Sequence, residues 1–254
     1  MIAIEYQDVC KHFDHAPRLS VDHVSAKIEQ GEFVTILGSS GCGKTTLLKM
    51  TNRLYEPTAG KVILFGEDIS TVDQVVVRRR MGYVIQQVGL FPHMTIEENI
   101  GVIPKILGWE KEKIRERAYE LLNLVGLEPD EFRSRYPSQL SGGQQQRIGL
   151  ARALATDPKI MLLDEPFGAI DAITRLNLQR ELMRIHTGTG KTFLLVTHDI
   201  NEAFKLGNRV MIMNEGKLLQ FDTPEEIVKH PADLFVETLI RSAREQEEFW
   251  KKVM

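Results

Sequence analysis

The sequence predicts an α/β protein in which a parallel sheet carries helices on its faces. Three features predict it: β-branched runs fill the first part of the chain, strands and helices alternate in the last part, and a helical stretch separates them. The chain has 254 residues, and its hydrophobic content of 43% is enough for a sizeable core. We therefore expect one domain, with a core from residues 1–88 and 153–254, an antiparallel β subdomain at the N-terminus and an inserted α-helical subdomain at about 89–152.

Short runs of high β-propensity predict the strands of the first part, and polar or glycine turns separate most of them. The expected strands are Ile2–Tyr6, Ser20–Ile28, Glu32–Leu37, Lys61–Phe65 and Met81–Gln86. Between the third and the fourth of them, Lys44–Leu54 carries leucines and contains neither Gly nor Pro. This segment therefore predicts a helix.

The elements of the rest of the chain are predicted from helical amphipathicity and from the alternation of helices with strands. Glu110–Val125 is rich in Glu, Lys, Arg and Leu, so we expect an exposed helix that ends before Gly126. Alternating helices and strands then favour a parallel sheet. The later elements are helix Gln144–Thr156, strand Ile160–Leu163, helix Ile173–His186, strand Phe193–Thr197, a hairpin of Arg209–Met213 with Lys217–Phe221 around Asn214-Glu215-Gly216, and a mostly helical end at Glu225–Met254.

Composition narrows the class of protein. The net charge is −3, which gives no overall basic field for nucleic acid or anionic lipid, and the basic run at Arg78–Arg80 is interpreted as a solvated face. The two cysteines, Cys10 and Cys42, indicate no structural disulfide and favour a reducing cytosol. No basic region follows Met1, and no run approaches ~18 uncharged apolar residues, so we expect neither a signal peptide nor a membrane span.

A glycine-rich segment between the predicted strand and helix fits the phosphate-binding pattern G-x-x-x-x-G-K-[ST]. Such a loop directs backbone N–H groups and a helix N-terminus at a phosphate chain. Lys44 adds a positive charge, and the hydroxyl of Thr45 is placed to hold Mg²⁺. The residues expected to bind nucleotide here are Gly38, Ser39, Ser40, Gly41, Cys42, Gly43, Lys44, Thr45 and Thr46.

A second predicted strand, Ile160–Leu163, ends in the two carboxylates Asp164 and Glu165. Ligands of open α/β sheets bind at the carboxyl ends of the strands, so these side chains can face the phosphate loop. We expect Asp164 to hold Mg²⁺, directly or through water, and Glu165 to polarise the attacking water. Many core strands end in acidic residues, and it is the phosphate loop upstream that favours the functional interpretation.

Leu140-Ser141-Gly142-Gly143-Gln144 reads LSGGQ and stands between the phosphate loop and the acidic strand. At these residues the chain resembles the ATP-binding cassette (ABC) family of P-loop NTPases, whose core is RecA-like. Ser141, Gly142 and Gly143 precede the predicted helix and form a second helix N-terminus suited to an anion. The resemblance implies that Ser141, Gly142, Gly143 and Gln144 contact the γ-phosphate bound to the other subunit of a head-to-tail homodimer.

Four further positions match the family's motifs in order. Phe13 matches the aromatic residue that stacks on adenine, although an ordinary core aromatic is the alternative. Gln86 matches the glutamine that reaches Mg²⁺ and the attacking water, with its neighbour Gln87 as the alternative. Asp171 matches the loop that contacts the opposite subunit, and His198 matches the switch histidine.

The resemblance therefore implies an ATPase that uses Mg²⁺. Its expected catalytic residues are Glu165, His198, Gln86 and Lys44, and its expected metal-binding residues are Thr45, Gln86 and Asp164. Hydrolysis of the γ-phosphate depends on positioning and charge neutralisation more than on covalent chemistry. Closing the dimer on ATP and opening it after hydrolysis would convert binding energy into motion.

Within the family, the segment Ile85–Ile100 and the stretch from Phe167 to Arg175 resemble the ATPases of importers for quaternary-amine osmoprotectants such as glycine betaine, carnitine and choline. This implies membrane permease subunits, an extracytoplasmic solute-binding protein, and a cytoplasmic protein held on the inner face of the cell membrane. An importer ATPase for another small solute, such as an amino acid, is the alternative. An ABC ATPase outside transport is the alternative from another class.

Two further expectations follow from the resemblance to this branch. The side chains of Phe91–Met94 are candidates for the wall of a groove that receives a coupling helix of the permease, with ordinary packing as the alternative. Many members of the branch carry a paired nucleotide-sensing module after the cassette. We expect no such module in this chain. We interpret its last helix as packed on the core, with a linker segment or a dimer contact as the alternatives.

Overall fold

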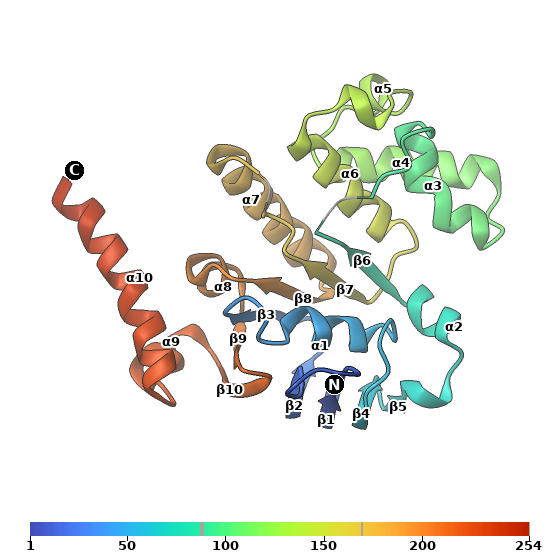
Figure 1. Ribbon diagram of the computed structural model, residues 1–254. Coiled ribbons are helices and arrows are strands. Elements are labelled where there is room, and N and C mark those ends of the chain that lie inside the picture. Colours follow the sequence, from blue (N-terminus) through green and yellow to red (C-terminus); the bar gives the residue numbers. More distant parts are fainter. Residues whose placement is uncertain (87–88, 169, 254) are drawn as a thin grey trace. The chain divides into compact units, whose positions relative to one another are not determined.

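The computed structural model describes residues 1–86, 89–168 and 170–253, and side chains up to residue 245 (Figure 1). The chain divides into two compact units. The first unit contains Met1–Val77 and Thr192–Met254, and the second contains Arg78–Lys191. Strands and helices occur in both units, which confirms the predicted α/β class.

The first unit contains an antiparallel sheet with the strand order β2-β1-β4-β5 (Figure 1). Its strands are β1 (Ile2–Lys11), β2 (Val21–Glu29), β4 (Ala59–Leu64) and β5 (Glu67–Asp68). The sheet confirms the expected antiparallel β subdomain. β1 extends beyond the predicted end at Tyr6, because Cys10 still pairs with Ala59 and Lys11 with Val21.

The other strands of the first unit have the order β10-β9-β3-β8, in which β10 is antiparallel to β9. They are β3 (Phe33–Gly38), β8 (Thr192–Thr197), β9 (Arg209–Asn214) and β10 (Lys217–Asp222). β3 is parallel to both β8 and β9 and is entirely buried, as the apolar sequence predicts. The predicted hairpin forms at Glu215 (φ 46°) and Gly216 (φ 85°), whose positive φ angles are those of a type I′ turn.

The helices of the first unit pack on its strands, and one core cluster includes Leu37, Ala203, Ile212 and Val236. They are α1 (Lys44–Thr51), the short η1 (Ile69–Thr71), α8 (Ile200–Leu206), α9 (Pro224–Lys229) and α10 (Leu234–Val253). α1 ends before the predicted Leu54, because the Asn52 side chain accepts the amide N–H of Leu54 and offers the backbone a turn instead.

The second unit combines the parallel pair β6 (Met81–Val84) and β7 (Ile160–Asp164) with helices. Its helices are α3 (Ile96–Ile106), α4 (Lys111–Leu124), α5 (Pro129–Phe132), η2 (Pro137–Gln139), α6 (Gly142–Leu154) and α7 (Ala172–Thr189), and α2 (Gln74–Arg79) lies where the sequence passes from one unit to the other. From residue 89 to 152 the described elements are all helical. Gly126 follows α4 with φ 68°, the left-handed C′ position that was predicted.

Several predicted boundaries were wrong by a few residues. β6 ends at Val84, so Gln86 lies beyond the strand. α6 begins at Gly142 rather than at Gln144, so the two glycines of the LSGGQ segment belong to the first helical turn instead of preceding it. A capping box between Ser141 and Gln144 sets this start. The sequence analysis did not predict α2 or α3.

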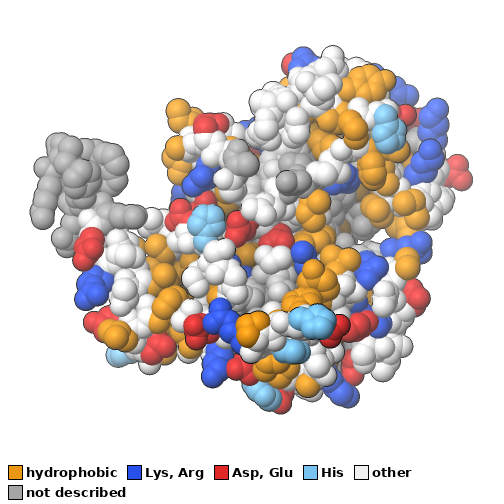
Figure 2. Space-filling model, viewed as in Figure 1, with side chains coloured by type: hydrophobic (Ala, Val, Ile, Leu, Met, Phe, Trp, Pro, Cys, Tyr) orange, Lys and Arg blue, Asp and Glu red, His pale blue; other side chains and the backbone are white. Residues whose placement is uncertain are grey.

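The surface carries both signs of charge. On the face drawn in Figure 2, Lys and Arg side chains are mixed with Asp and Glu, in keeping with the net charge of −3. Arg78, Arg79 and Arg80 are exposed, as predicted. Among the residues that the structure describes, no helix combines the length and the apolar character that crossing a bilayer requires.

Candidate nucleotide-binding site

The phosphate-loop segment connects β3 to α1, which is the arrangement that the sequence predicts. Two of its glycines, Gly38 and Gly43, are required by close backbone packing. A Cβ on Gly38 would lie 2.1 Å from the carbonyl oxygen of Met213, and one on Gly43, at φ 103°, would lie 2.0 Å from that of Ser20. Ser39, Ser40 and Gly41 are exposed. The loop is thus held tightly at both ends and open to solvent in its middle.

Lys44 is buried beneath this loop, with 5% of its surface exposed. Its Nζ donates hydrogen bonds to the carbonyl oxygens of Gly38 at 2.8 Å and Ser39 at 2.9 Å. The positively charged ammonium group thus lies among neutral carbonyls beside an exposed loop. Its charge is complementary to the negative charge of a phosphate chain. Burial raises the pKa of the Cys42 thiol, and the nearby Lys44 charge offsets part of that rise. Thr45 and Thr46 follow in the first turn of α1 and are half-buried.

Phe13 lies shortly after β1, where it is half-buried. Its ring packs edge-on against Tyr55, with centroids 5.2 Å apart, and Lys11 Nζ lies 5.2 Å from the ring centre. Tyr55 is a residue that sequence reasoning missed, since nothing local connects it to Phe13. These contacts fix the orientation of an aromatic ring that keeps part of its surface available for stacking.

His198 follows β8 directly and is exposed. Leu37 at the end of β3 pairs with Thr197 at the end of β8, so His198 and the phosphate loop leave the sheet at the same edge. Thr197 Oγ1 donates to Glu202 Oε2 at 2.7 Å, and Asp199 N donates to Thr197 Oγ1 at 3.1 Å. The structure thus brings a predicted catalytic histidine to the edge at which ligands of α/β sheets bind.

In the second unit the structure brings three predicted residues together at the end of β7. Asp164 is the last residue of the strand and is 7% exposed, and Tyr83 donates a hydrogen bond from its hydroxyl to Asp164 Oδ2 at 3.4 Å. Gln86 Nε2 donates to Glu165 Oε2 at 3.2 Å. Gln87, the alternative to Gln86, lies outside the described residues. The sequence analysis did not identify Tyr83 as a partner of Asp164.

The LSGGQ segment begins α6. Ser141 caps this helix: its hydroxyl accepts the amide N–H of Gln144 at 3.3 Å, and its own N–H donates to Gln144 Oε1 at 2.9 Å. A pocket of about 440 Å³ opens here and is lined in part by Ser141, Gly143 and Gln144. A Cβ on Gly143 would lie 2.3 Å from the Thr174 side chain, so a larger residue there would force Thr174 at the start of α7 to shift.

Asp171 is exposed and caps the N-terminus of α7. Its carboxylate accepts the amide N–H of Thr174 at 3.0 Å, and this backbone hydrogen bond is the main reason that the pKa of Asp171 is lowered. The cap gives this residue a local structural role. Asp171 is exposed, and its contact with a partner subunit remains a prediction.

The turn that contains Phe91–Met94 is held by a buried residue that sequence reasoning missed. Asn99, in α3, accepts the Phe91 N–H at 2.8 Å and donates from Nδ2 to the carbonyl oxygens of Phe91, Met94 and Thr95. Phe91 itself is 40% exposed. The capping box between Thr95 and Glu98, a pattern readable in the sequence, is the signal that could have located α3 and therefore Asn99.

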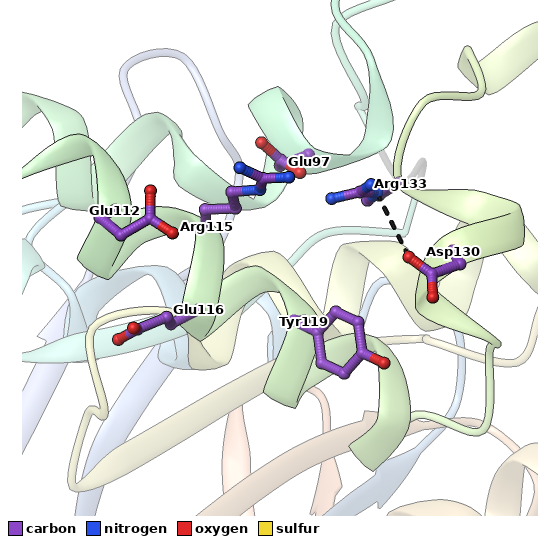
Figure 3. Close-up of a pocket in the computed structure, with 7 residues that line it drawn as sticks. All are labelled: Glu97, Glu112, Arg115, Glu116, Tyr119, Asp130 and Arg133. Carbon is purple, nitrogen blue, oxygen red and sulfur yellow. Dashed lines mark ion pairs between the residues drawn. The ribbon is translucent and has the colours of Figure 1, made fainter.

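Charged side chains from three neighbouring helices surround another pocket of the second unit, of about 340 Å³ (Figure 3). In Figure 3 the two arginines of this pocket lie among the carboxylates, and Arg133 pairs with Asp130 at 3.7 Å. The pocket does not include the predicted groove wall at Phe91–Met94. Its lining consists of Glu97, Glu112, Arg115, Glu116, Tyr119, Asp130 and Arg133.

Comparison with solved structures supports the fold. The chain is 35% identical to the ATP-binding cassette MJ0796, solved as a dimer in a post-hydrolysis state bound to ADP and Pi. The superposition has a TM-score of 0.77 and covers 87% of this chain and 98% of that one. A second dimeric structure of MJ0796, described as a bacterial ABC transporter cassette, gives a TM-score of 0.78 at 36% identity.

Curated relatives are closer in sequence. The chain is 52% identical over 241 residues to the carnitine transport ATP-binding protein OpuCA of Listeria monocytogenes, which covers 95% of this chain and 60% of that protein. It is 53% identical to the choline transport ATP-binding protein OpuBA of Bacillus subtilis, over 89% of this chain and 59% of that protein. The chain thus spans about 60% of the length of these relatives. A family description of ABC transporters matches residues 21–168. Together with the described fold, this match shows that the chain belongs to the ABC transporter family.

Proposed function

We propose that this chain is the ATP-binding and ATP-hydrolysing part of an ABC importer for quaternary-amine osmoprotectants such as glycine betaine, carnitine or choline. The observation that carries the proposal is the identity of 52–53% with ATP-binding proteins named for carnitine and choline transport. The buried Lys44 and the Gln86–Glu165 hydrogen bond support the ATPase activity. ATP is the proposed substrate, and residues 1–254 are proposed to form one nucleotide-binding domain with a helical subdomain at about 89–152.

ATP binding is assigned to the phosphate loop and to Phe13. Backbone N–H groups from Gly38 to Thr46 and the start of α1 would receive the phosphates, and Lys44 would move its hydrogen bonds from loop carbonyls to phosphate oxygens. The ring of Phe13, held by Tyr55, would stack on the adenine.

Hydrolysis is assigned to side chains at or just after the ends of strands and to Thr45 in the first turn of α1. Thr45, Gln86 and Asp164 provide the oxygen donors that Mg²⁺ prefers, and the ion, when bound, neutralises phosphate charge. Glu165 accepts the proton of the attacking water or orients the water electrostatically, and Gln86 holds that carboxylate. His198 contacts the γ-phosphate from the edge that it shares with the phosphate loop.

A head-to-tail homodimer is proposed to complete each ATP site. The N-terminus of α6, with Ser141, Gly142, Gly143 and Gln144, would meet the γ-phosphate bound to the other subunit, and Asp171 would contact that subunit. The pocket of about 440 Å³ in front of Ser141 leaves room for such a ligand. The MJ0796 cassette of the same fold was solved as a dimer.

The proposed partners are membrane permease subunits and, through them, an extracytoplasmic solute-binding protein, and the proposed location is the cytoplasmic face of the cell membrane. The exposed Phe91 turn, fixed by Asn99, is assigned to the contact with the permease. The net charge of −3 supports no role for nucleic acid.

ATP hydrolysis by this chain in lipid vesicles, assembled with the permease of its transport system, tests the proposal. The matching binding protein is added alone or with glycine betaine, carnitine or choline. We expect one amine-loaded binding protein to stimulate hydrolysis. Robust hydrolysis that no amine changes would preserve the ATPase assignment and overturn the cargo, and absence of hydrolysis from the folded assembly would overturn both.

A further inference from the structure

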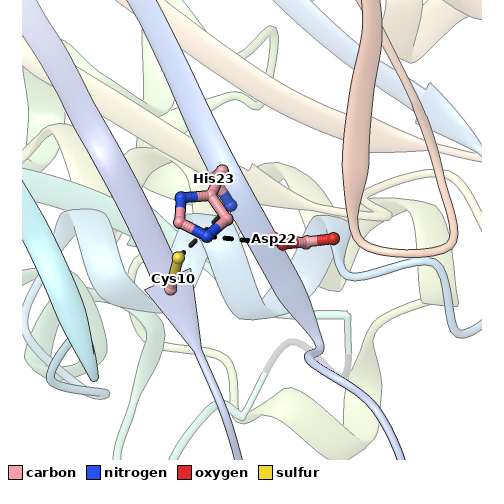
Figure 4. A group of neighbouring side chains, drawn as sticks. All are labelled: Cys10, Asp22 and His23. Atoms are coloured by element: carbon pink, nitrogen blue, oxygen red, sulfur yellow. Dashed lines mark hydrogen bonds and ion pairs between the residues drawn. The ribbon is translucent and has the colours of Figure 1, made fainter.

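Three side chains of the types that bind metal ions lie close together in the antiparallel sheet (Figure 4). They are separate from the residues assigned to nucleotide binding. Cys10 comes from β1, and Asp22 and His23 come from the start of β2. The sulfur of Cys10, an imidazole nitrogen of His23 and a carboxylate oxygen of Asp22 all lie within 4.8 Å of one another. Cys10 is buried, whereas His23 is exposed, so the group is open to solvent on one side.

The imidazole of His23 is held with one nitrogen turned to this group. Its Nδ1 bonds to Asp8 Oδ1 at 2.8 Å, and its Nε2 lies 4.0 Å from Asp22 Oδ1. A carboxylate on one imidazole nitrogen fixes the tautomer and orients the other nitrogen toward a metal in many protein sites. Asp8 therefore supplies the outer support that a metal-binding histidine normally has.

The backbone at these residues is irregular. Asp8 and His23 both have φ 51°, which is uncommon for residues other than glycine. The pairing of β1 with β2 shifts register between Tyr6 and Val9 and again between Val9 and Lys11. Such bulges redirect side chains, and conformations of this kind cluster at functional sites. The irregularity coincides with the group formed by Cys10, Asp22 and His23.

We propose that Cys10, Asp22 and His23 bind a zinc ion, with water as the fourth ligand. A thiolate, an imidazole and a carboxylate form a donor set that suits Zn²⁺ and disfavours Mg²⁺ and Ca²⁺, which prefer oxygen alone. Tetrahedral coordination at bond lengths of ~2.0–2.3 Å separates the ligand atoms by about 3.3–3.8 Å. The donor atoms, which lie within 4.8 Å of one another, therefore need to approach by at most about 1.0–1.5 Å.

Lys217 modulates this site. Its Nζ lies 3.7 Å from Asp22 Oδ2, which leaves Oδ1 as the oxygen nearer His23. A positive charge beside a ligand opposes the binding of a cation, because like charges repel. The Lys217→Gln substitution removes that charge and is expected to raise zinc affinity several-fold.

The first test uses the full chain without nucleotide, with Co²⁺ as a spectroscopic probe that Zn²⁺ displaces. We expect one Co²⁺ per chain and a sulfur-to-cobalt charge-transfer band in the near ultraviolet. The two cysteines of the chain provide a matched pair of variants. Cys10→Ser is expected to abolish the band and Cys42→Ser to keep it. A band that survives Cys10→Ser, or none in the unmodified protein, would overturn the proposal.

A second pair of variants separates binding from folding. His15, like His23, has a positive φ (64° against 51°), and Asn tolerates that conformation well. We expect His23→Asn to weaken zinc binding by at least tenfold in calorimetry, with His15→Asn unchanged, while both keep the circular dichroism of the unmodified protein. Equal zinc affinity in the two variants would refute the site. Because no nucleotide is present, either result is independent of the proposed ATPase activity.

Discussion

Gln86 donates a hydrogen bond from Nε2 to Oε2 of Glu165 across 3.2 Å, although 79 positions separate the two residues. Glu165 has φ 45°, a left-handed conformation that costs a non-glycine residue on the order of 1–3 kcal/mol. The neutral amide holds the carboxylate without transferring a proton to it. A carboxylate fixed in this way keeps its capacity to accept a proton from water.

We expect Glu165→Gln to lower ATP hydrolysis by roughly 10²–10⁴-fold, the usual contribution of a general base. The amide oxygen of the new Gln can still accept from Gln86, so the turn should persist and MgATP should hold the protein as a dimer. Hydrolysis is measured by phosphate release and the dimer by size-exclusion chromatography with MgATP. Glu225→Gln, at an exposed residue of α9, is the control. A Glu165→Gln protein that remains monomeric would contradict the proposed role.

Lys44→Ala is expected to weaken ATP binding by roughly 10- to 100-fold, because a charge-assisted hydrogen bond is worth about 1.5–3 kcal/mol. Titration calorimetry measures the affinity, and circular dichroism verifies the fold, since Lys44 is buried. Lys27→Ala removes an exposed lysine that pairs with Glu5 and should leave the affinity unchanged. Unchanged ATP affinity in Lys44→Ala would exclude Lys44 as a phosphate ligand.

Phe13→Ala is expected to weaken ATP binding by about tenfold, since base stacking on an aromatic side chain is worth ~1–3 kcal/mol. Inorganic triphosphate has no base, so its affinity should stay the same. Phe13→Trp should restore most of the loss for ATP. Equal losses for ATP and triphosphate would instead indicate a packing role, through the contact with Tyr55.

Ser141 has a structural role and a proposed functional role that two substitutions separate. Ser141→Ala removes the cap of α6 and should lower the free energy of unfolding by about 1 kcal/mol. Ser141→Asp keeps a cap but places a negative charge where the γ-phosphate is expected. Urea unfolding should show normal stability for Ser141→Asp, and its ATPase activity in the assembled importer should be lost. Normal activity in that variant would remove Ser141 from the site.

Glu98 predicts a pH dependence of stability. The N–H of Thr95 donates to Glu98 at 2.8 Å, and this bond is the first cause of a lowered pKa for that carboxyl group. A pKa lowered on folding stabilises the protein above the unfolded value of about 4.3, and the stabilisation disappears as pH falls through the folded value. Glu98→Gln can accept the same bond without titrating. In urea unfolding, its stability should therefore decline less than that of the unmodified protein as pH falls from 7 to 3, and parallel curves would contradict this assignment.

Local features of the sequence predicted the strand–loop–helix arrangement of the phosphate loop, the hairpin at Glu215-Gly216 and the C′ glycine at position 126. Each depends on the conformational preferences of a few consecutive residues, and the structure confirms each one. The predicted ends of helices and strands were less accurate. Asn52 ends α1 early and the capping box starts α6 early, because side-chain hydrogen bonds to the backbone compete with simple periodicity.

The sequence by itself determined the α/β class and the family, because both follow from contiguous motifs and from hydrophobic periodicity. Only the tertiary structure placed His198 at the edge of the phosphate loop, through the pairing of Leu37 with Thr197. It also brought the Gln86 side chain within hydrogen-bonding distance of Glu165. It placed Cys10 next to His23, where the pairing of β1 with β2 is irregular. These relationships depend on strand register and on packing between distant segments, which no local preference of the chain encodes.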